Sequence, residues 1–227
     1  MVLVSVIGLA LVACGNKEKV VEAEPLAPQP YGTEDTNVEL WLENMEVGSR
    51  ELYAAREAVV EALQLSTGEV VADIGSGTGL YTVLFSPAVG EDGVVFAVDI
   101  ETRFLKLVNQ RVADLDLENV VLVFSRQDDV TLPRESTDTI FIADSYHYFR
   151  DPEDILGSIR GALRPGGRLV IVDYHLDEEA RADPNKKHLR FGKDGLVSEI
   201  EGFGFRLANE PTVDGLSEFY MVVFERT

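Results

Sequence analysis

The stretch that decides the fold is Val70-Val71-Ala72-Asp73-Ile74-Gly75-Ser76-Gly77-Thr78-Gly79. Its first half is a short apolar run, typical of a strand, and its second half is a glycine-rich turn that leads into an amphipathic segment. Glycines allow positive φ and let a ligand approach the backbone closely. We therefore expect a ligand site at this turn, although a glycine-rich turn alone also suits dinucleotides.

Apolar runs and amphipathic segments alternate on the carboxyl side of this stretch. We expect strands at 69–74, 94–98, 120–124, 139–143 and 168–173, helices at 80–86, 101–115, 152–163 and 193–201, and a final antiparallel pair at 205–210 and 218–225. Pro87 should stop the first of these helices. Repeated strand–helix alternation predicts an α/β fold with a doubly wound, mostly parallel sheet covered on both faces. Ligands of such sheets bind beyond the carboxyl ends of the strands.

The length of 227 residues suits one domain with a short extension. We expect a lipoprotein-type signal peptide at 1–13, a charged, proline-rich and disordered tether at 14–36, and the folded domain at 37–227. Within that domain, 37–65 should form N-terminal helices and 66–227 the α/β core. The helical pattern breaks at Gly48, and Ser49 is the expected cap of the second helix.

The start of the chain resembles an export signal. Residues 1–13 are apolar but too short to span a membrane, and they lead to the only cysteine, Cys14. The sequence Leu11-Val12-Ala13-Cys14 resembles the cleavage motif of bacterial lipoproteins, in which the cysteine receives the lipid. The resemblance implies a lipid-anchored protein of the bacterial cell envelope, on the periplasmic or outer face. No Lys or Arg precedes the apolar run, so the alternative is an unprocessed leader and a cytoplasmic domain.

Charge and composition exclude several classes of function. The chain has 20 Lys and Arg against 40 Asp and Glu, for a net charge of −20. Such a surface repels phosphate backbones, so we expect no nucleic-acid partner. One cysteine excludes an internal disulfide framework. The three histidines, His147, His175 and His188, are scattered, and we expect no dedicated metal centre.

Two acids near the glycine turn help to choose its ligand. Asp73 lies two residues before the first glycine, where it would repel a pyrophosphate but attract an ammonium or sulfonium. Position 80 is Leu80, whereas the dinucleotide pattern has Gly or Ala there, and no P-loop Lys-Ser/Thr pair follows. Asp99 ends the second strand and can accept hydrogen bonds from both hydroxyls of a ribose.

The chain from about residue 50 to 227 resembles the class I S-adenosylmethionine-dependent methyltransferases, of the ubiquinone/menaquinone type. The segments that carry the resemblance are Val70–Gly79, Ala97-Val98-Asp99-Ile100, Gln127-Asp128-Asp129-Val130-Thr131-Leu132-Pro133 and Leu163-Arg164-Pro165-Gly166-Gly167-Arg168-Leu169. The resemblance implies seven strands, the last antiparallel, and S-adenosyl-L-methionine as cofactor.

The resemblance also implies a set of donor-binding residues. The methionine part of the donor should face the loop that carries Gly75, Ser76, Gly77 and Gly79, next to Asp73. Asp99 should hold the ribose. Ile100 should pack on the adenine, and Asp128 should accept from its amine. Asp144 opens the segment that should border the methyl group.

The catalytic residues should follow the fourth strand, in Asp144-Ser145-Tyr146-His147-Tyr148-Phe149. His147 has a suitable pKa for a general base, and its alternative role is packing. Tyr146 belongs to an expected aromatic wall. His175, after the fifth strand, opens onto the same face.

We expect methyl transfer to a small-molecule acceptor. The alternatives are a lipoprotein that binds S-adenosylmethionine or its product without catalysis, and a nicotinamide-dependent oxidoreductase, against which Leu80 argues.

Overall fold

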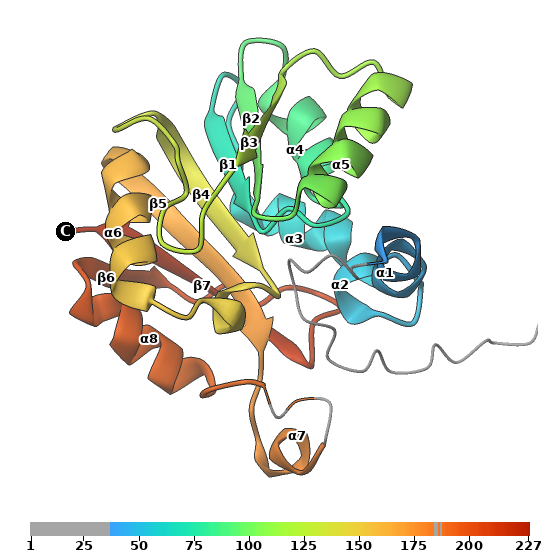
Figure 1. The fold of residues 1–227 in the computed structure, drawn as a ribbon. Coiled ribbons are helices and arrows are strands. Elements are labelled where there is room, and N and C mark those ends of the chain that lie inside the picture. The colour runs from blue at the N-terminus through green and yellow to red at the C-terminus, as the bar shows by residue number, and fades with distance from the viewer. Residues whose placement is uncertain (1–36, 184–185, 187) are drawn as a thin grey trace, which may run out of the picture.

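The computed structural model describes residues 37–183, 186 and 188–227, so the predicted signal peptide, the tether and Cys14 lie outside the described residues. One mixed sheet of seven strands forms the centre (Figure 1), in the order β3-β2-β1-β4-β5-β7-β6. The strands are β1 (Val70–Ile74), β2 (Val94–Asp99), β3 (Val120–Phe124), β4 (Thr137–Ala143), β5 (Leu163–Tyr174), β6 (Phe205–Asn209) and β7 (Phe219–Arg226). The first five strands are parallel, and β7 runs antiparallel to both β5 and β6. The predicted doubly wound sheet is confirmed.

Helices cover both faces of the sheet (Figure 1). They are α1 (Val38–Met45), α2 (Glu51–Ala54), α3 (Arg56–Leu63), α4 (Thr82–Val89), α5 (Thr102–Asp114), α6 (Pro152–Ala162), α7 (Glu178–Ala182) and α8 (Lys193–Gly202), with a 3-10 turn at Tyr146–Tyr148. One apolar cluster joins α2, α3 and α4 to the sheet, and a second joins α6 and α8 to its other face. No helix in the described part of the chain is long and apolar enough to cross a membrane.

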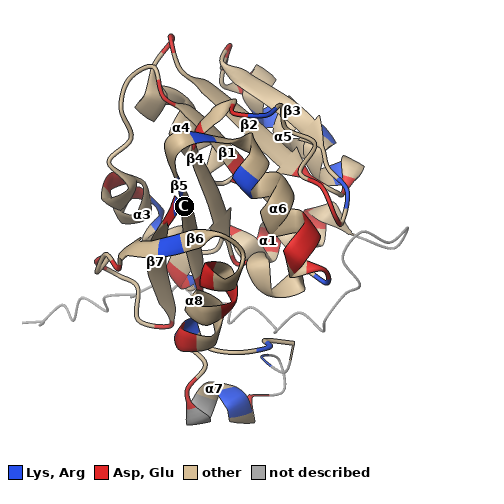
Figure 2. Cartoon of the chain, turned by 90° about the vertical axis from the view of Figure 1, so that its left-hand side faces the viewer, with Lys and Arg blue, Asp and Glu red and all other residues tan. Residues whose placement is uncertain are grey.

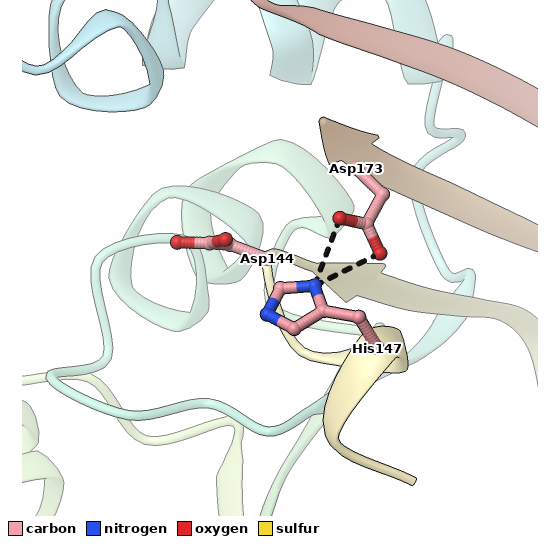
Figure 3. Close-up of side chains that lie close together, drawn as sticks. All are labelled: Asp144, His147 and Asp173. Atoms are coloured by element: carbon pink, nitrogen blue, oxygen red, sulfur yellow. Dashed lines mark hydrogen bonds and ion pairs between the residues drawn. The ribbon is translucent and has the colours of Figure 1, made fainter. Parts of the chain in front are cut away.

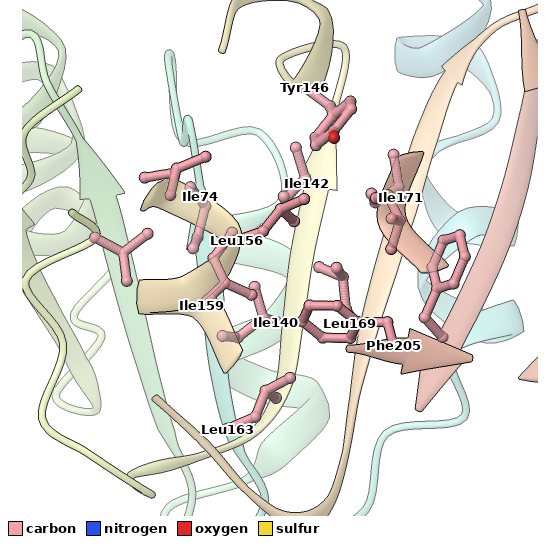
Figure 4. Packing of buried hydrophobic residues seen from close by; sticks show 14 of the residues in the cluster. Ile74, Ile140, Ile142, Tyr146, Leu156, Ile159, Leu163, Leu169, Ile171 and Phe205 are labelled. Atoms are coloured by element: carbon pink, nitrogen blue, oxygen red, sulfur yellow. The ribbon is translucent and has the colours of Figure 1, made fainter. Parts of the chain in front are cut away.

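The central strand β4 contributes side chains to both apolar clusters, because successive side chains of a strand point to opposite faces of the sheet. Ile140 and Ile142 face α6, where they pack with Leu156 and Ile159 (Figure 4). Phe141, between them, faces α3 and α4 and is fully buried. Its ring contacts Tyr81 and Phe85, at centroid separations of 4.9 Å and 5.1 Å. The alternation along β4 thus explains why its sequence is almost continuously apolar.

The excess of acidic residues is spread over helices and loops. Figure 2 shows acidic segments along α8 and at several loops, with Lys and Arg interspersed among them.

Three local expectations were wrong. Arg50, and not Ser49, is the N-cap residue of α2, and no side chain caps that helix; the Arg50 side chain instead pairs with Asp144, 94 residues away. Pro87 lies inside α4, which continues to Val89, because a proline in the last turn removes only one amide donor. Strand β5 begins at Leu163, since Thr137 of β4 pairs with Leu163 before a register shift.

Phe141→Ala should destabilise the domain by about 3–5 kcal/mol, because it removes a fully buried ring from the aromatic cluster with Tyr81 and Phe85. Urea unfolding followed by circular dichroism measures this. The control is Phe124→Ala on β3, where the side chain is 56% exposed and truncation should cost less than 1 kcal/mol. Similar losses for both variants would contradict the proposed position of the core.

Candidate active site

The glycine turn is fixed by the end of β2. The amides of Gly75 and Ser76 donate to the carbonyl of Val98, at 2.9 Å and 3.1 Å. The Asp99 side chain is buried, and its Oδ2 accepts from the amide of Gly77 at 2.8 Å. Its Oδ1 accepts from the amide of Glu101, also at 2.8 Å. One carboxylate therefore holds the glycine turn and the start of α5 in place.

The glycines of the turn have different structural roles. Gly75 has a φ of +70°, and a Cβ there would meet Ser145 Oγ at 2.5 Å, so this glycine lets the segment after β4 approach the turn. Gly79 has a φ of +81°, and a Cβ there would meet Val108 of α5 at 2.9 Å. Gly77 has more room, since the nearest atom to its Cβ would be Met45 Cε at 3.7 Å. Gly79 is thus required for helix packing as well as for the turn.

Two hydroxyls in the turn have no partner. Ser76 Oγ and Thr78 Oγ1 are buried and make no hydrogen bond to any described residue. Buried hydroxyls are normally satisfied, so these two are suited to a polar ligand. Carboxylate oxygens such as those of Asp99 accept more than one hydrogen bond each. The turn therefore fits a ligand with a ribose and a polar amino-acid part, as S-adenosylmethionine has.

Asp73 is a buried acid without a cation. Its Oδ2 accepts from Thr82 Oγ1 at 2.6 Å. Burial raises the pKa of Asp73 to about 7; the Thr82 hydrogen bond acts in the opposite direction, and the nearby charge of Asp99 raises it further. A ligand cation near Asp73 would favour its ionised form.

The two residues expected at the adenine lie near the end of β2. Ile100 is half-buried directly after Asp99. Asp128 is exposed on the loop after β3, where it pairs with Arg126 at 3.2 Å. That loop runs beside β2, because the Ser125 amide donates to the Asp99 carbonyl. Both positions are compatible with a base bound beside Asp99, and their roles stay predictions.

The segment after β4 reaches the glycine turn. Asp144 has a φ of +50°, and its side chain forms an ion pair with Arg50. Ser145 Oγ lies 3.5 Å from the Gly75 carbonyl. Tyr146 is fully buried in the core, and its hydroxyl donates to Glu199 Oε1 of α8 at 2.6 Å. Tyr146 is therefore part of the core, and its expected catalytic role stays a prediction.

His147 and Asp173 form a buried pair. His147 Nδ1 lies 2.9 Å and 3.2 Å from the two carboxylate oxygens of Asp173, at the end of β5 (Figure 3). Both side chains are only 5% exposed. Burial by itself would lower the pKa of His147, but the charge and hydrogen bond of Asp173 outweigh it, so the pKa is raised. Nε2 is buried and has no partner among the described residues.

Sequence reasoning missed Arg50 and the role of Asp173. The sequence did hold a signal for Asp173, because an acid lies in one of the last two positions of three strands, at the same edge of the sheet: Asp73 in β1, Asp99 in β2 and Asp173 in β5. No sequence feature pointed to Arg50, because only the folded chain brings α2 to the end of β4. His175, expected to open onto the same face, is exposed after β5, and its ring contacts that of Tyr220 edge-on at 5.2 Å; its role stays a prediction.

Comparison with known proteins identifies the family of the chain. The methyltransferase domain family matches residues 65–204. The ubiquinone/menaquinone biosynthesis C-methyltransferase UbiE of Pseudomonas savastanoi is 34% identical over 116 residues, which are 51% of this chain and 45% of that protein. UbiE of Methylococcus capsulatus is 30% identical over 131 residues, 57% of this chain and 52% of that protein. The chain thus spans about half the length of these relatives.

A solved structure shows the same fold over most of the chain. It is a SAM-dependent methyltransferase from Aquifex aeolicus, with a TM-score of 0.73 and 24% identity, and the match covers 85% of this chain and all of that one. The family match over residues 65–204 covers more than half of this chain. This chain belongs to the methyltransferase domain family.

Asp73→Asn should stabilise the folded protein more at about pH 8 than at about pH 5. Between pH 4 and pH 7 the unfolded chain loses the Asp73 proton while the folded chain keeps it, so the free energy of unfolding falls as pH rises through that window. An asparagine removes this loss, worth on the order of 4 kcal/mol, and its carbonyl can still accept from Thr82.

Urea unfolding of both proteins at the two pH values measures the difference, with Asp92→Asn, an exposed acid before β2, as the control. A stability difference that is the same at both pH values would show that Asp73 titrates as an ordinary exposed acid.

Proposed function

We propose that this protein transfers the methyl group of S-adenosylmethionine to a small-molecule acceptor. The observation that carries the proposal is the glycine turn held by Asp99, in which the hydroxyls of Ser76 and Thr78 have no partner among the described residues. The segment after β4, which contacts this turn through Ser145, also carries His147, whose buried Nε2 likewise has no described partner. The likeness to C-methyltransferases and the shared fold support it. The bound donor would supply an electrophilic methyl group on a sulfonium.

Different residues at the carboxyl edge of the sheet would bind different parts of the donor. Asp99 would accept from the ribose hydroxyls, and Asp128 and Ile100 would contact the adenine. Gly75, Ser76, Gly77 and Gly79 would face the amino-acid part. Asp73, which is buried without a cation, would ionise beside the positive charge of the donor and attract it. Asp144, paired with Arg50, would border the methyl group.

His147 would act as the general base. Methyl transfer from a sulfonium needs no protonation of the leaving group, so the enzyme contributes alignment, exclusion of water and, for a protic acceptor, a base. The likeness to proteins named C-methyltransferases supports the need for a base, because a carbon acceptor must lose a proton during methylation. An acceptor that arrives as an anion or thiolate would instead react by proximity alone.

The same proposal extends to the place of the protein in the cell. Cys14 would carry lipid, and residues 14–36 would hold the domain off a membrane of the bacterial envelope. The net charge of −20 supports a small molecule, and not a nucleic acid, as the substrate. If the leader is not processed, the domain acts in the cytoplasm, where the donor is made. The two locations are separated by the state of the N-terminus.

Incubation with methyl-labelled S-adenosylmethionine and a bacterial small-molecule extract tests the activity. Label transferred to a small molecule supports the proposal. Binding of donor without any transfer would favour the non-catalytic alternative, and heat from NAD but not from the donor in calorimetry would favour an oxidoreductase.

Asp99→Asn should weaken the binding of S-adenosylhomocysteine, the demethylated product, at least roughly tenfold, because a charge-assisted hydrogen bond is worth about 1.5–3 kcal/mol. Isothermal titration calorimetry measures the affinity, which we expect in the micromolar range for the native chain. Asp92→Asn is the control. Because Asp99 also holds the Gly77 amide, the 2′-deoxy analogue of the product should show a similar loss with the native chain. Unchanged affinity for that analogue would refute the ribose contact.

Cys14→Ser should leave an unprocessed, unlipidated precursor in a bacterial host, because that residue is the only cysteine and the expected lipid acceptor. Mass spectrometry of the N-terminus and detergent partitioning report the outcome. The native chain should enter the detergent phase with more than one acyl chain, since a single chain anchors only marginally. A native chain that keeps Met1 and stays in the aqueous phase would exclude the lipid anchor.

A further inference from the structure

The strands β4 and β5 bring together a carboxylate and an imidazole that approach from separate segments. His147 lies on the 3-10 turn after β4, and Asp173 lies next to the last residue of β5. Their contact joins Nδ1 to the carboxylate at 2.9 Å, and both side chains are buried. A neutral imidazole carries one N–H, and a carboxylate can only accept. The contact therefore places the proton on Nδ1.

The other imidazole nitrogen is left as an acceptor without a donor. Nε2 is buried and unpartnered among the described residues. In Figure 3 it points away from Asp173, toward the side on which Asp144 lies. Asp144 opens the segment whose next residue, Ser145, contacts the glycine turn. A lone pair on Nε2 thus faces the region where the expected donor site and the end of β4 meet.

We propose that Asp173 is a positioning residue that holds the proton of His147 on Nδ1, so that Nε2 is the atom that removes a proton from the acceptor. The inference rests on the proposed methyl transfer and adds to it the class of acceptor. The acceptor carries its proton until the transfer step, as a hydroxyl group or an activated carbon–hydrogen group does. It is not a thiolate or another preformed anion, for which such a base has no use.

The step balances in atoms and charge. The bond between the acceptor atom and hydrogen breaks, and the proton goes to Nε2. The acceptor atom bonds to the methyl carbon, while the carbon–sulfur bond breaks and its electron pair stays on sulfur. The sulfonium becomes a neutral thioether, and the positive charge passes to the imidazolium. Asp173, 2.9 Å from Nδ1, stabilises that charge.

The charges around His147 favour a base over a metal ligand. Asp144, His147 and Asp173 offer ligand atoms within 4.8 Å of one another. However, Asp144 is already paired with Arg50, and Asp173 with His147. A divalent cation bound by the Asp144 carboxylate would lie beside the Arg50 guanidinium that pairs with it. The groups that face His147 are Asp144, Asp173 and Arg190, together with the rings of Tyr148, Tyr174 and His188.

The aromatic neighbours suit a flat acceptor. The rings of Tyr148 and His188 are nearly parallel, with an interplanar angle of 6° and centroids 5.4 Å apart. The His147 ring lies 4.3 Å from that of Tyr148, and Tyr148 is 42% exposed. A planar acceptor, such as a phenol or an enolisable dicarbonyl compound, could stack on such faces. This neighbourhood agrees with a protic acceptor whose proton is made acidic by conjugation.

Nuclear magnetic resonance of the imidazole nitrogens tests the positioning role without an acceptor. The full chain, labelled with 15N-histidine, has only three such side chains to assign. We expect the neutral form of His147 to carry its proton on Nδ1. We also expect the pKa of His147 to lie above the ordinary histidine value of about 6.5. Asp173→Asn should abolish the tautomer preference and lower the titration midpoint, whereas Asp92→Asn should change neither. A proton on Nε2 in the native chain, or an unchanged His147 in Asp173→Asn, would overturn the inference.

Kinetics test the acceptor class. Probe acceptors are catechol and acetylacetone, which carry their protons at neutral pH, and 2-nitro-5-thiobenzoate, which is already a thiolate, each with labelled S-adenosylmethionine. We expect transfer to catechol or acetylacetone, with a rate that rises with pH through the His147 titration. His147→Ala should lower kcat by roughly 10²–10⁴-fold and remove that rise. Asp173→Asn should lower kcat and shift the rise to lower pH, with the KM for the donor unchanged.

The controls separate this inference from the proposed function. Should Asp173→Asn fail to fold, as judged by its amide spectrum, His147→Gln takes its place in the kinetics. Transfer to the thiolate 2-nitro-5-thiobenzoate alone, or a rate indifferent to both variants, would overturn the base while leaving methyl transfer intact. A native chain that binds neither the donor nor its product would overturn the proposed function itself. Selective broadening of His147 signals by micromolar Mn²⁺ would replace the base with a metal site.

Discussion

The arrangement of the site depends on one buried carboxylate. Asp99 ends β2 inside the protein, and its two oxygens are satisfied by the amides of Gly77 and Glu101. A buried carboxylate needs such donors, and the amides can reach it only if the chain after β1 folds back in the conformation that glycines allow. The conformation of the glycine turn after β1 and the position of the start of α5 are therefore fixed by the same carboxylate.

Four acids meet at the carboxyl edge of the sheet, and each is compensated in a different way. Asp99 is held by backbone amides, Asp144 by Arg50, and Asp173 by His147. Asp73 accepts from the hydroxyl and the backbone amide of Thr82 and forms no ion pair with a described residue, and burial raises its pKa to about 7. The two sides of this edge therefore differ: Asp73 can bind a cation, and the His147–Asp173 pair can accept a proton. A donor with a sulfonium and an acceptor that must lose a proton need such a pair of places, which is the physical basis of the proposed chemistry.

Much of this arrangement could be predicted from the sequence, and the reasons are local. The strands are continuous apolar runs, and Asp99 directly follows one of them, so its place at the edge of the sheet follows from strand order. The glycine turn is recognisable because a strand precedes it and a helix follows. These features depend on residues that are near one another along the chain.

The remaining features depend on contacts between distant segments. Arg50 reaches Asp144 across 94 positions, and His147 reaches Asp173 across 26. Tyr146 and His147 are neighbours in the sequence, yet one enters the core and the other faces Asp173, because the 3-10 turn points them in different directions. Sequence patterns could propose both as catalytic, and only the fold separates them.

The most direct test of the account is a 15N amide spectrum of the full chain, titrated with S-adenosylhomocysteine. The account predicts that the amides of Gly75, Ser76, Gly77 and Glu101 shift and saturate together, because the ligand binds at the turn that Asp99 holds. The amide of Gly93, at the opposite edge of the sheet, should not move. A spectrum that NAD changes but S-adenosylhomocysteine does not, or shifts confined to residues far from this turn, would contradict it.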